Sequence, residues 1–171
     1  MSRSRFAVAL ALVSCASAQT RPSAVPENLK VPDGQSLLLR ASARGAQIYT
    51  CKPKAADAAS LEWALKAPEA DLFDQSGAKI GRHYAGPTWE VADGSRVVGE
   101  VVQRAAVEGA IPWLLLKAKS HEGAGALANV TYIQRVDTAG GVAPATGCDA
   151  GTAGAEARVD YTANYLFYWT R

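Results

Sequence analysis

Short runs of alternating apolar and polar residues recur along most of the chain. Residues 61–67 alternate with a period of two, and residues 158–169 repeat the pattern with large aromatic side chains on one face. This period is typical of a β-strand that packs one face against a core. Residues 111–118 are apolar without alternation, which predicts a central strand that is covered on both faces.

Glycine and proline separate these runs and predict where strands end. Arg44-Gly45 predicts a tight hairpin that divides residues 36–52 into two strands. Pro68 is expected to end one strand before another begins at Ala70. Roughly nine to eleven short strands with little helix predict an all-β fold, a single antiparallel β-sandwich or barrel with long loops. Sandwich and barrel show the same alternation, so both remain open at this point.

The N-terminal residues 1–18 have the organisation of a secretory signal peptide. A basic start is followed by a short apolar stretch and by the small-residue cleavage motif Ala16-Ser17-Ala18. The apolar stretch is too short to span a bilayer as a helix. We therefore expect export, to the periplasm or the medium. After it, residues 19–34 contain three prolines and predict an extended arm, and residues 35–171 form a single β-rich domain.

The same N-terminal segment supports a second interpretation. Leu12-Val13-Ser14-Cys15 has the form of a bacterial lipobox, in which the cysteine is lipidated and becomes the N-terminus. One lipid chain would hold the domain at a membrane surface. Membrane anchoring is thus expected only if Cys15 is lipidated, and no transmembrane span is predicted elsewhere in the chain.

Cys51 and Cys148 are the two cysteines outside the N-terminal segment. In an oxidising compartment an even pair predicts a disulfide. The alternative, a pair of thiolate metal ligands, has no C-x-x-C spacing to support it.

The charge of the chain argues against nucleic acid as a partner. The sequence has 18 basic and 16 acidic residues, and removal of residues 1–18 takes away Arg3 and Arg5. The remaining 18 − 2 = 16 basic residues balance the acidic ones. Positive charge is also not clustered, which excludes the footprint of a polyanion-binding protein. No G-x-G-x-x-G joins a strand to a helix, so a dinucleotide cofactor domain is excluded as well.

Residues 81–95 bring together histidine, tyrosine, tryptophan and acidic side chains, which are types that often contact ligands. Most of the four tryptophans are expected in the core, and Trp89 is the best candidate for an exposed side chain that stacks on a sugar. Arg135 and Asp137 lie two residues apart on one strand face, where they form either a polar cluster with Glu90 or an ordinary ion pair. The primary hypothesis is a non-enzymatic module that binds an envelope or extracellular partner, either a small molecule, a glycan or a protein. Its candidate binding residues are His83, Tyr84, Trp89, Glu90, Asp93 and Arg135.

An enzymatic alternative also centres on this region. His83 with His121, Glu90 and Asp93 supplies the ligand types that a metal ion needs, although no H-x-H spacing is present. Glu69 with Asp71, or Glu90 with Asp93, gives paired carboxylates like those of glycosidases. No G-x-S-x-G elbow occurs. The alternative is therefore a metal-dependent oxidoreductase or hydrolase at His83, with the catalytic residues unassigned. No cofactor is predicted beyond a possible metal ion.

Short motifs spread over the domain carry a family likeness. They are AQIYTC (46–51), APEA (67–70), HYAGPTW (83–89), DGS (93–95), IPWLL (111–115), YIQRV (132–136) and YTANY (161–165). The chain resembles a family of secreted proteins of bacteria and fungi that is catalogued as a domain of unknown function, number 3455. The likeness runs from about Val31 to Tyr168. It implies a secreted β-rich domain and no particular activity.

Overall fold

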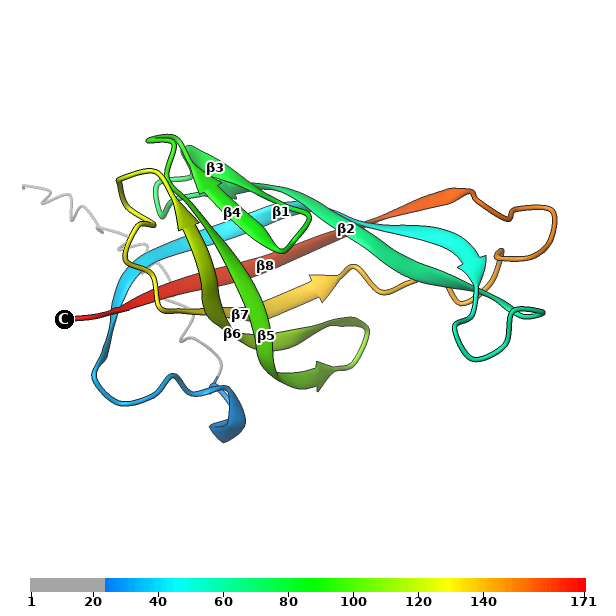
Figure 1. Cartoon of the computed structure of the whole chain (residues 1–171), viewed down its shortest axis with the longest axis horizontal. Helices are drawn as coiled ribbons and strands as arrows, with labels where there is room; N and C mark the ends of the chain where they lie inside the picture. The colour runs from blue at the N-terminus through cyan, green and yellow to red at the C-terminus, as the bar shows by residue number, and fades with distance from the viewer. Residues whose placement is uncertain (1–23) are drawn as a thin grey trace, which may run out of the picture.

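The computed structural model describes residues 24–171, in which eight antiparallel strands form one sheet that closes into a barrel (Figure 1). Each strand pairs with the next, and β1 pairs with β8 to close the ring. The all-β prediction is confirmed, as a barrel. The predicted signal peptide, its predicted cleavage site and Cys15 lie outside the described residues. The strands are β1 (Gln35–Pro53), β2 (Leu61–Phe73), β3 (Lys79–Tyr84), β4 (Thr88–Val91), β5 (Arg96–Val107), β6 (Ala110–Glu122), β7 (Tyr132–Gly140) and β8 (Glu156–Thr170).

Strand β1 runs without interruption through Arg44-Gly45, so the predicted hairpin at this position is wrong. Gly45 lies opposite Ala70 of β2. A Cβ atom at Gly45 would stand 2.0 Å from the carbonyl oxygen of Glu69. The glycine therefore allows the backbones of β1 and β2 to approach each other closely, and close approach is a common reason for a glycine inside a strand.

Strand β2 likewise continues through Pro68, where a break was predicted. Pro68 lies opposite Gln47 of β1. On its other side β2 pairs with β3 only over residues 70–73, so Pro68 lies in a section of β2 that has one free edge. A proline is tolerated at a free edge, where no strand requires an N–H group.

Strands β1, β2 and β8 run on beyond the short strands β3 and β4 (Figure 1). The loop between β7 and β8 folds back onto this extension. Cys148 in the loop forms a disulfide with Cys51 of β1, with 5.3 Å between the Cα atoms, which confirms the predicted pair. The indole N–H of Trp63 also donates to the carbonyl oxygen of Thr146 at 2.9 Å. The loop is therefore fixed to the extension at two points.

The described part of the N-terminal arm packs against the barrel. It contains one 3-10 turn, η1 (Glu27–Leu29), within the segment for which an extended conformation was predicted. Leu29 is fully buried, and its carbonyl oxygen accepts a hydrogen bond from Gln134 of β7 at 2.6 Å. The side-chain amide of Asn28 donates to the carbonyl oxygen of Arg104 in β5 at 3.1 Å.

Large aromatic side chains are packed in the barrel interior. Trp89, Tyr165 and Phe167 are fully buried, with Leu116 and Ile133 packed in the same cluster. Burial of side chains of this size provides most of the driving force for folding. Within residues 24–171, no helix is long and apolar enough to cross a membrane.

Candidate functional site

The wall of the barrel has an opening on one side. Strand β2 meets β3 only over residues 70–73, and β5 meets β4 only over residues 96–98. Residues 61–69 of β2 and 99–107 of β5 therefore face each other with no strand between them. A cavity of about 480 Å³ opens here, beside the turn between β3 and β4. Its lining comprises Gln47, Tyr49, Leu65, Lys66, Ala67, Pro68, His83, Gly86, Pro87, Val101, Arg104, Ile111, Pro112, Leu114 and Arg135.

Arg135 brings a positive charge to the inside of the barrel. In the strand register it lies between Leu114 of β6 and Tyr165 of β8, both of which are buried. Its Nε and Nη2 atoms donate to the carbonyl oxygen of Pro112 at 3.0 and 2.9 Å. These bonds use two of the five N–H donors of a guanidinium. Among residues 24–171, no carboxylate forms an ion pair with Arg135.

The titratable groups around Arg135 are neutral at physiological pH. Burial raises the pKa of Tyr49, Tyr161 and Tyr165 above the usual range, and the charge of Arg135 opposes this only in part. Burial, with a smaller contribution from the charge of Arg135 and against the opposing hydrogen bond to Thr88, lowers the pKa of His83 to about 3. No aspartate or glutamate lines the cavity. The cavity is therefore electropositive.

His83 is a buried, neutral ring in a fixed tautomer. Its Nδ1 atom lies 2.9 Å from the carbonyl oxygen of Thr88. A carbonyl oxygen only accepts hydrogen bonds, so Nδ1 carries the proton and Nε2 keeps its lone pair. The ring stacks on Trp89, with 4.5 Å between centroids and an interplanar angle of 12°.

Gln47 is a polar side chain of the cavity with an unsatisfied donor. It is 2% exposed, and its Nε2 atom has no hydrogen-bond partner in the described part of the chain. A buried donor without a partner costs about 1–3 kcal/mol. Gln47 was not nominated from the sequence. A signal did exist, because the alternation of residues 47, 49 and 51 places this glutamine on the same face as a tyrosine and a buried cysteine.

The nominated binding residues do not form one site. His83 and Arg135 line the cavity. Trp89 is 1% exposed, so the expectation of an exposed stacking surface on this residue is wrong. Strand pairing places Trp89 opposite His83 on the inward face, where its ring packs edge-on against Tyr165 at 5.2 Å and against Phe167 at 6.0 Å.

Tyr84 and Glu90 belong to a polar cluster on the outer face of β3 and β4. The hydroxyl of Tyr84 donates to Glu90 at 2.8 Å, and Arg82 donates to both carboxylate oxygens at 3.1 Å. The bond from Tyr84, followed by that from Arg82, lowers the pKa of Glu90. Tyr84, Arg82 and Glu90 thus find hydrogen-bond partners within this cluster.

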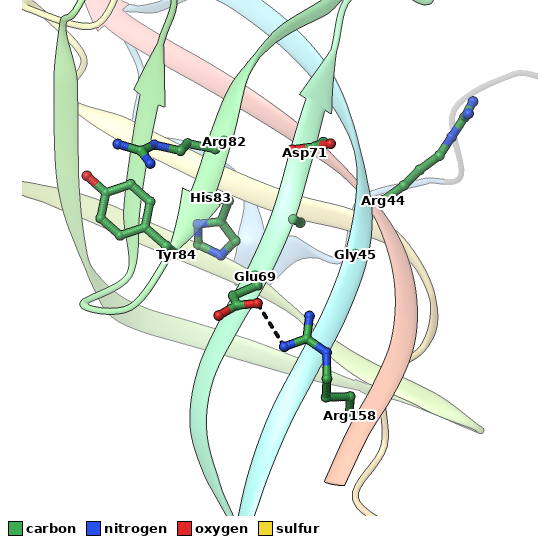
Figure 2. Close-up of a pocket in the computed structure, with 9 residues that line it drawn as sticks. Arg44, Gly45, Glu69, Asp71, Arg82, His83, Tyr84 and Arg158 are labelled. Carbon is green, nitrogen blue, oxygen red and sulfur yellow. Dashed lines mark hydrogen bonds and ion pairs between the residues drawn. The ribbon is translucent and has the colours of Figure 1, made fainter. Parts of the chain in front are cut away.

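Figure 2 shows a pocket of about 440 Å³ that Arg82 and Tyr84 of this cluster line together with Glu69 and Asp71 of β2. Glu69 pairs with Arg158 at 2.8 Å, and Asp71 pairs with Lys79 at 2.7 Å. Exposed pairs of this kind are ordinary features of a protein surface. The carboxylates of a glycosidase would instead face a bound sugar.

Asp93 stabilises a turn. Its Oδ1 atom accepts hydrogen bonds from the backbone N–H and the hydroxyl of Ser95 at 2.8 and 2.6 Å, and its Oδ2 atom accepts one from the N–H of Ala126 at 2.8 Å. These bonds lower the pKa of Asp93. The residue thus ties the turn between β4 and β5 to the loop after β6.

Within residues 24–171, Arg135 and Asp137 form neither the polar cluster with Glu90 nor the ion pair that were the two alternatives. The pairing of β7 with β8 shifts register between Val136 and Ala139, and Asp137 adopts a positive φ of 51°. Its carboxylate accepts a hydrogen bond from Asn164 at 3.0 Å. The irregularity breaks the alternation that would have placed both side chains on one face.

The residues nominated as metal ligands do not converge. Nowhere in residues 24–171 do three or more histidine, cysteine, aspartate or glutamate side chains gather closely enough to hold a metal ion. The Nε2 atom of His121 lies 2.7 Å from the carbonyl oxygen of Val130. Glu90 and Asp93 are engaged as described above.

Comparison with known proteins gives a family and no function. The family model described as "Protein of unknown function (DUF3455)" matches residues 32–169. No curated protein and no solved structure matches the chain.

Proposed function

We propose that the chain, which belongs to the DUF3455 family of proteins of unknown function, is an exported module that binds one small molecule inside its barrel. The cavity between β2 and β5 carries this proposal. Its volume of about 480 Å³ lies within the range of about 300–1,000 Å³ that is typical of small-molecule sites. Eight-stranded barrels are also wide enough to hold one small ligand.

The composition of the cavity favours a ligand with a largely apolar body. Most of the side chains at the opening are apolar, and Leu65 remains exposed there. Apolar walls with a few polar groups are the usual composition of a binding site for a small molecule. Residues 81–95 contribute one margin of the opening through His83, Gly86 and Pro87.

No specific observation supports the enzymatic alternative at His83. One ring nitrogen is engaged with the carbonyl oxygen of Thr88, and burial keeps the ring neutral by lowering its pKa to about 3. Within residues 24–171, no set of metal-ligating side chains surrounds it. The binding function is therefore the proposal that the geometry supports best.

A bulky side chain at the opening is expected to block ligand uptake. Val101 lines the cavity, and Val102 beside it does not and is 45% exposed. We expect the neutral fluorescent probe N-phenyl-naphthylamine to bind the wild-type protein with one-to-one stoichiometry. Val101→Trp should weaken this binding at least about tenfold, or about 1.4 kcal/mol. Val102→Trp is the matched control and should bind like the wild type. Absence of binding to the wild type, or equal binding by both variants, would contradict the proposal.

Export is the second part of the proposal, and the motif pattern of residues 1–18 supports it. We expect protein recovered from an exporting host to begin at Gln19 and to lack two hydrogens at Cys51 and Cys148. Mass spectrometry of the denatured protein measures both. A mass that includes lipid on Cys15 would select the lipid-anchored form, and an intact N-terminus starting at Met1 would rule out processing.

A further inference from the structure

We propose that the bound molecule is a small organic monocarboxylate whose carboxylate group pairs with Arg135 and Gln47 while its apolar body fills the opening. This inference rests on the proposed binding function and specifies the chemical class of the ligand.

The charges around the cavity point to an anion. Lys66, Arg104 and Arg135 line it, and no acidic residue does. Lys66 already pairs with Glu156 at 2.5 Å, at the surface. Arg135 differs, because it is half-buried, its strand register places it between buried residues, and no carboxylate in residues 24–171 pairs with it. A charge drawn away from water without a counter-charge is costly. An anionic ligand removes that cost.

Gln47 provides an independent observation at the same cavity. Its side chain is almost completely buried, and its Nε2 atom donates to no group of the described chain. Such a donor is unusual in a folded protein and calls for a specific explanation. A carboxylate has two oxygens, so it can accept from the guanidinium and from the amide of Gln47 together.

The neighbouring polar groups are already engaged. The hydroxyl of Tyr49 donates to the carbonyl oxygen of Gly141 at 2.5 Å, and Nδ1 of His83 is bonded to the carbonyl oxygen of Thr88. The lone pair on Nε2 of His83 accepts a hydrogen bond and does not donate one. Arg104 is exposed at the surface, so the free donors inside the barrel are those of Arg135 and Gln47, which suit one planar carboxylate.

The apolar part of the ligand is set by the rest of the lining. Leu114 lies opposite Arg135 in the sheet, Pro112 accepts the hydrogen bonds of Arg135, and Val101 lines the same cavity from β5. A ligand with one charged end and an aliphatic or aromatic body fits this division. An inorganic anion would leave the apolar walls unused.

The test uses ligands that differ only in the charged group. Butanoate, hexanoate, octanoate and decanoate are titrated into the full domain by calorimetry at neutral pH, each beside its primary alcohol. We expect at least one acid to bind more than about tenfold tighter than its alcohol. Arg135→Met should remove this preference, Arg135→Lys should retain part of it, and Gln47→Leu should reduce it. Arg82→Met, which removes an arginine from the outer face, is the matched control and should leave it unchanged.

The outcomes separate the inference from the proposed function. Equal binding of acids and alcohols would overturn the carboxylate and leave the binding function standing. Binding of neither series, together with no uptake of the neutral probe, would overturn both. Inorganic phosphate that competes as well as its organic counterparts would show that the apolar body is irrelevant and would also overturn the inference. If Arg135→Met does not fold, then Arg135→Lys and Gln47→Leu decide the question, and unchanged acid preference in both would refute it.

Discussion

Removal of the disulfide is expected to lower the free energy of unfolding by about 4–5 kcal/mol. Cys51 and Cys148 are separated by 97 residues, so the bridge closes a loop that contains most of the barrel. In the chain-entropy description, such a loop restricts the unfolded chain strongly and the folded chain hardly at all. The double replacement Cys51→Ala with Cys148→Ala removes the restriction. Urea unfolding of the wild type and the variant measures the loss.

The bridge also affects the cavity. Beside it, the N–H of Cys51 donates to the carbonyl oxygen of Ala155 at 2.9 Å, and that of Gly154 donates to Cys51 at 2.8 Å. The same loop begins with Gly141, which accepts the hydrogen bond from Tyr49 at the cavity. We therefore expect the variant to bind the neutral probe more weakly even under conditions where it remains folded.

A reductant serves as the internal control. In protein that begins at Gln19 and therefore lacks Cys15, reductant should lower the stability of the bridged protein to that of the double variant and leave the variant unaffected. A loss smaller than about 1 kcal/mol would show that the loop is held by its hydrogen bonds rather than by the bridge.

The sequence predicted most of the strands because their alternation reflects direct contact with the core, but it predicted nine to eleven where the described residues form eight. It failed at Gly45 and Pro68, where a glycine and a proline were interpreted as ends of strands. At position 45 a glycine is required because the backbone of Glu69 approaches too closely for a Cβ atom. At Pro68 the cause is a free strand edge. Both causes lie in residues that are distant in the sequence, so local patterns cannot distinguish them from turns.

The candidate site was predictable only in part. Residues 81–95 attracted attention because polar and aromatic side chains are concentrated there, but strand pairing directs His83 and Trp89 inward and Tyr84 and Glu90 outward. Arg135 could be found from sequence as a charge in line with the apolar Ile133. The opening could not be predicted from the sequence, because it arises where the short strands β3 and β4 pair with only part of the longer strands β2 and β5.

Acid is expected to destabilise the protein through His83 before the carboxylates titrate. The pKa of His83 is about 3 in the folded protein and about 6.5 in an unfolded chain. Between these values the unfolded state binds one more proton than the folded state, so the free energy of unfolding falls as the pH falls. Each pH unit corresponds to about 1.4 kcal/mol. The loss from this residue should reach about 2–3 kcal/mol at pH 4.5 and about 4–5 kcal/mol near pH 3.

His83→Gln isolates this contribution because it removes the titrating ring and keeps a side-chain donor for the carbonyl oxygen of Thr88. Its overall stability at neutral pH should fall, since the stacking on Trp89 is lost. Its free energy of unfolding should nevertheless vary little between pH 6.5 and 4.5. His121→Gln changes an exposed histidine and should keep the wild-type slope. Urea unfolding at several pH values measures all three proteins.

The slope of the free energy of unfolding against pH also tests whether His83 accepts a proton inside the cavity. If the wild type and His83→Gln show the same slope over this range, His83 accepts a proton inside the fold, and the interior beside Arg135 admits enough water to carry a second positive charge. If only the wild type shows the slope, His83 remains neutral inside the fold, beside a guanidinium that is charged in any protein at these pH values. The interior then presents an unchanged positive site to an anion over the whole range. Any loss of carboxylate binding on acidification would in that case follow from protonation of the ligand.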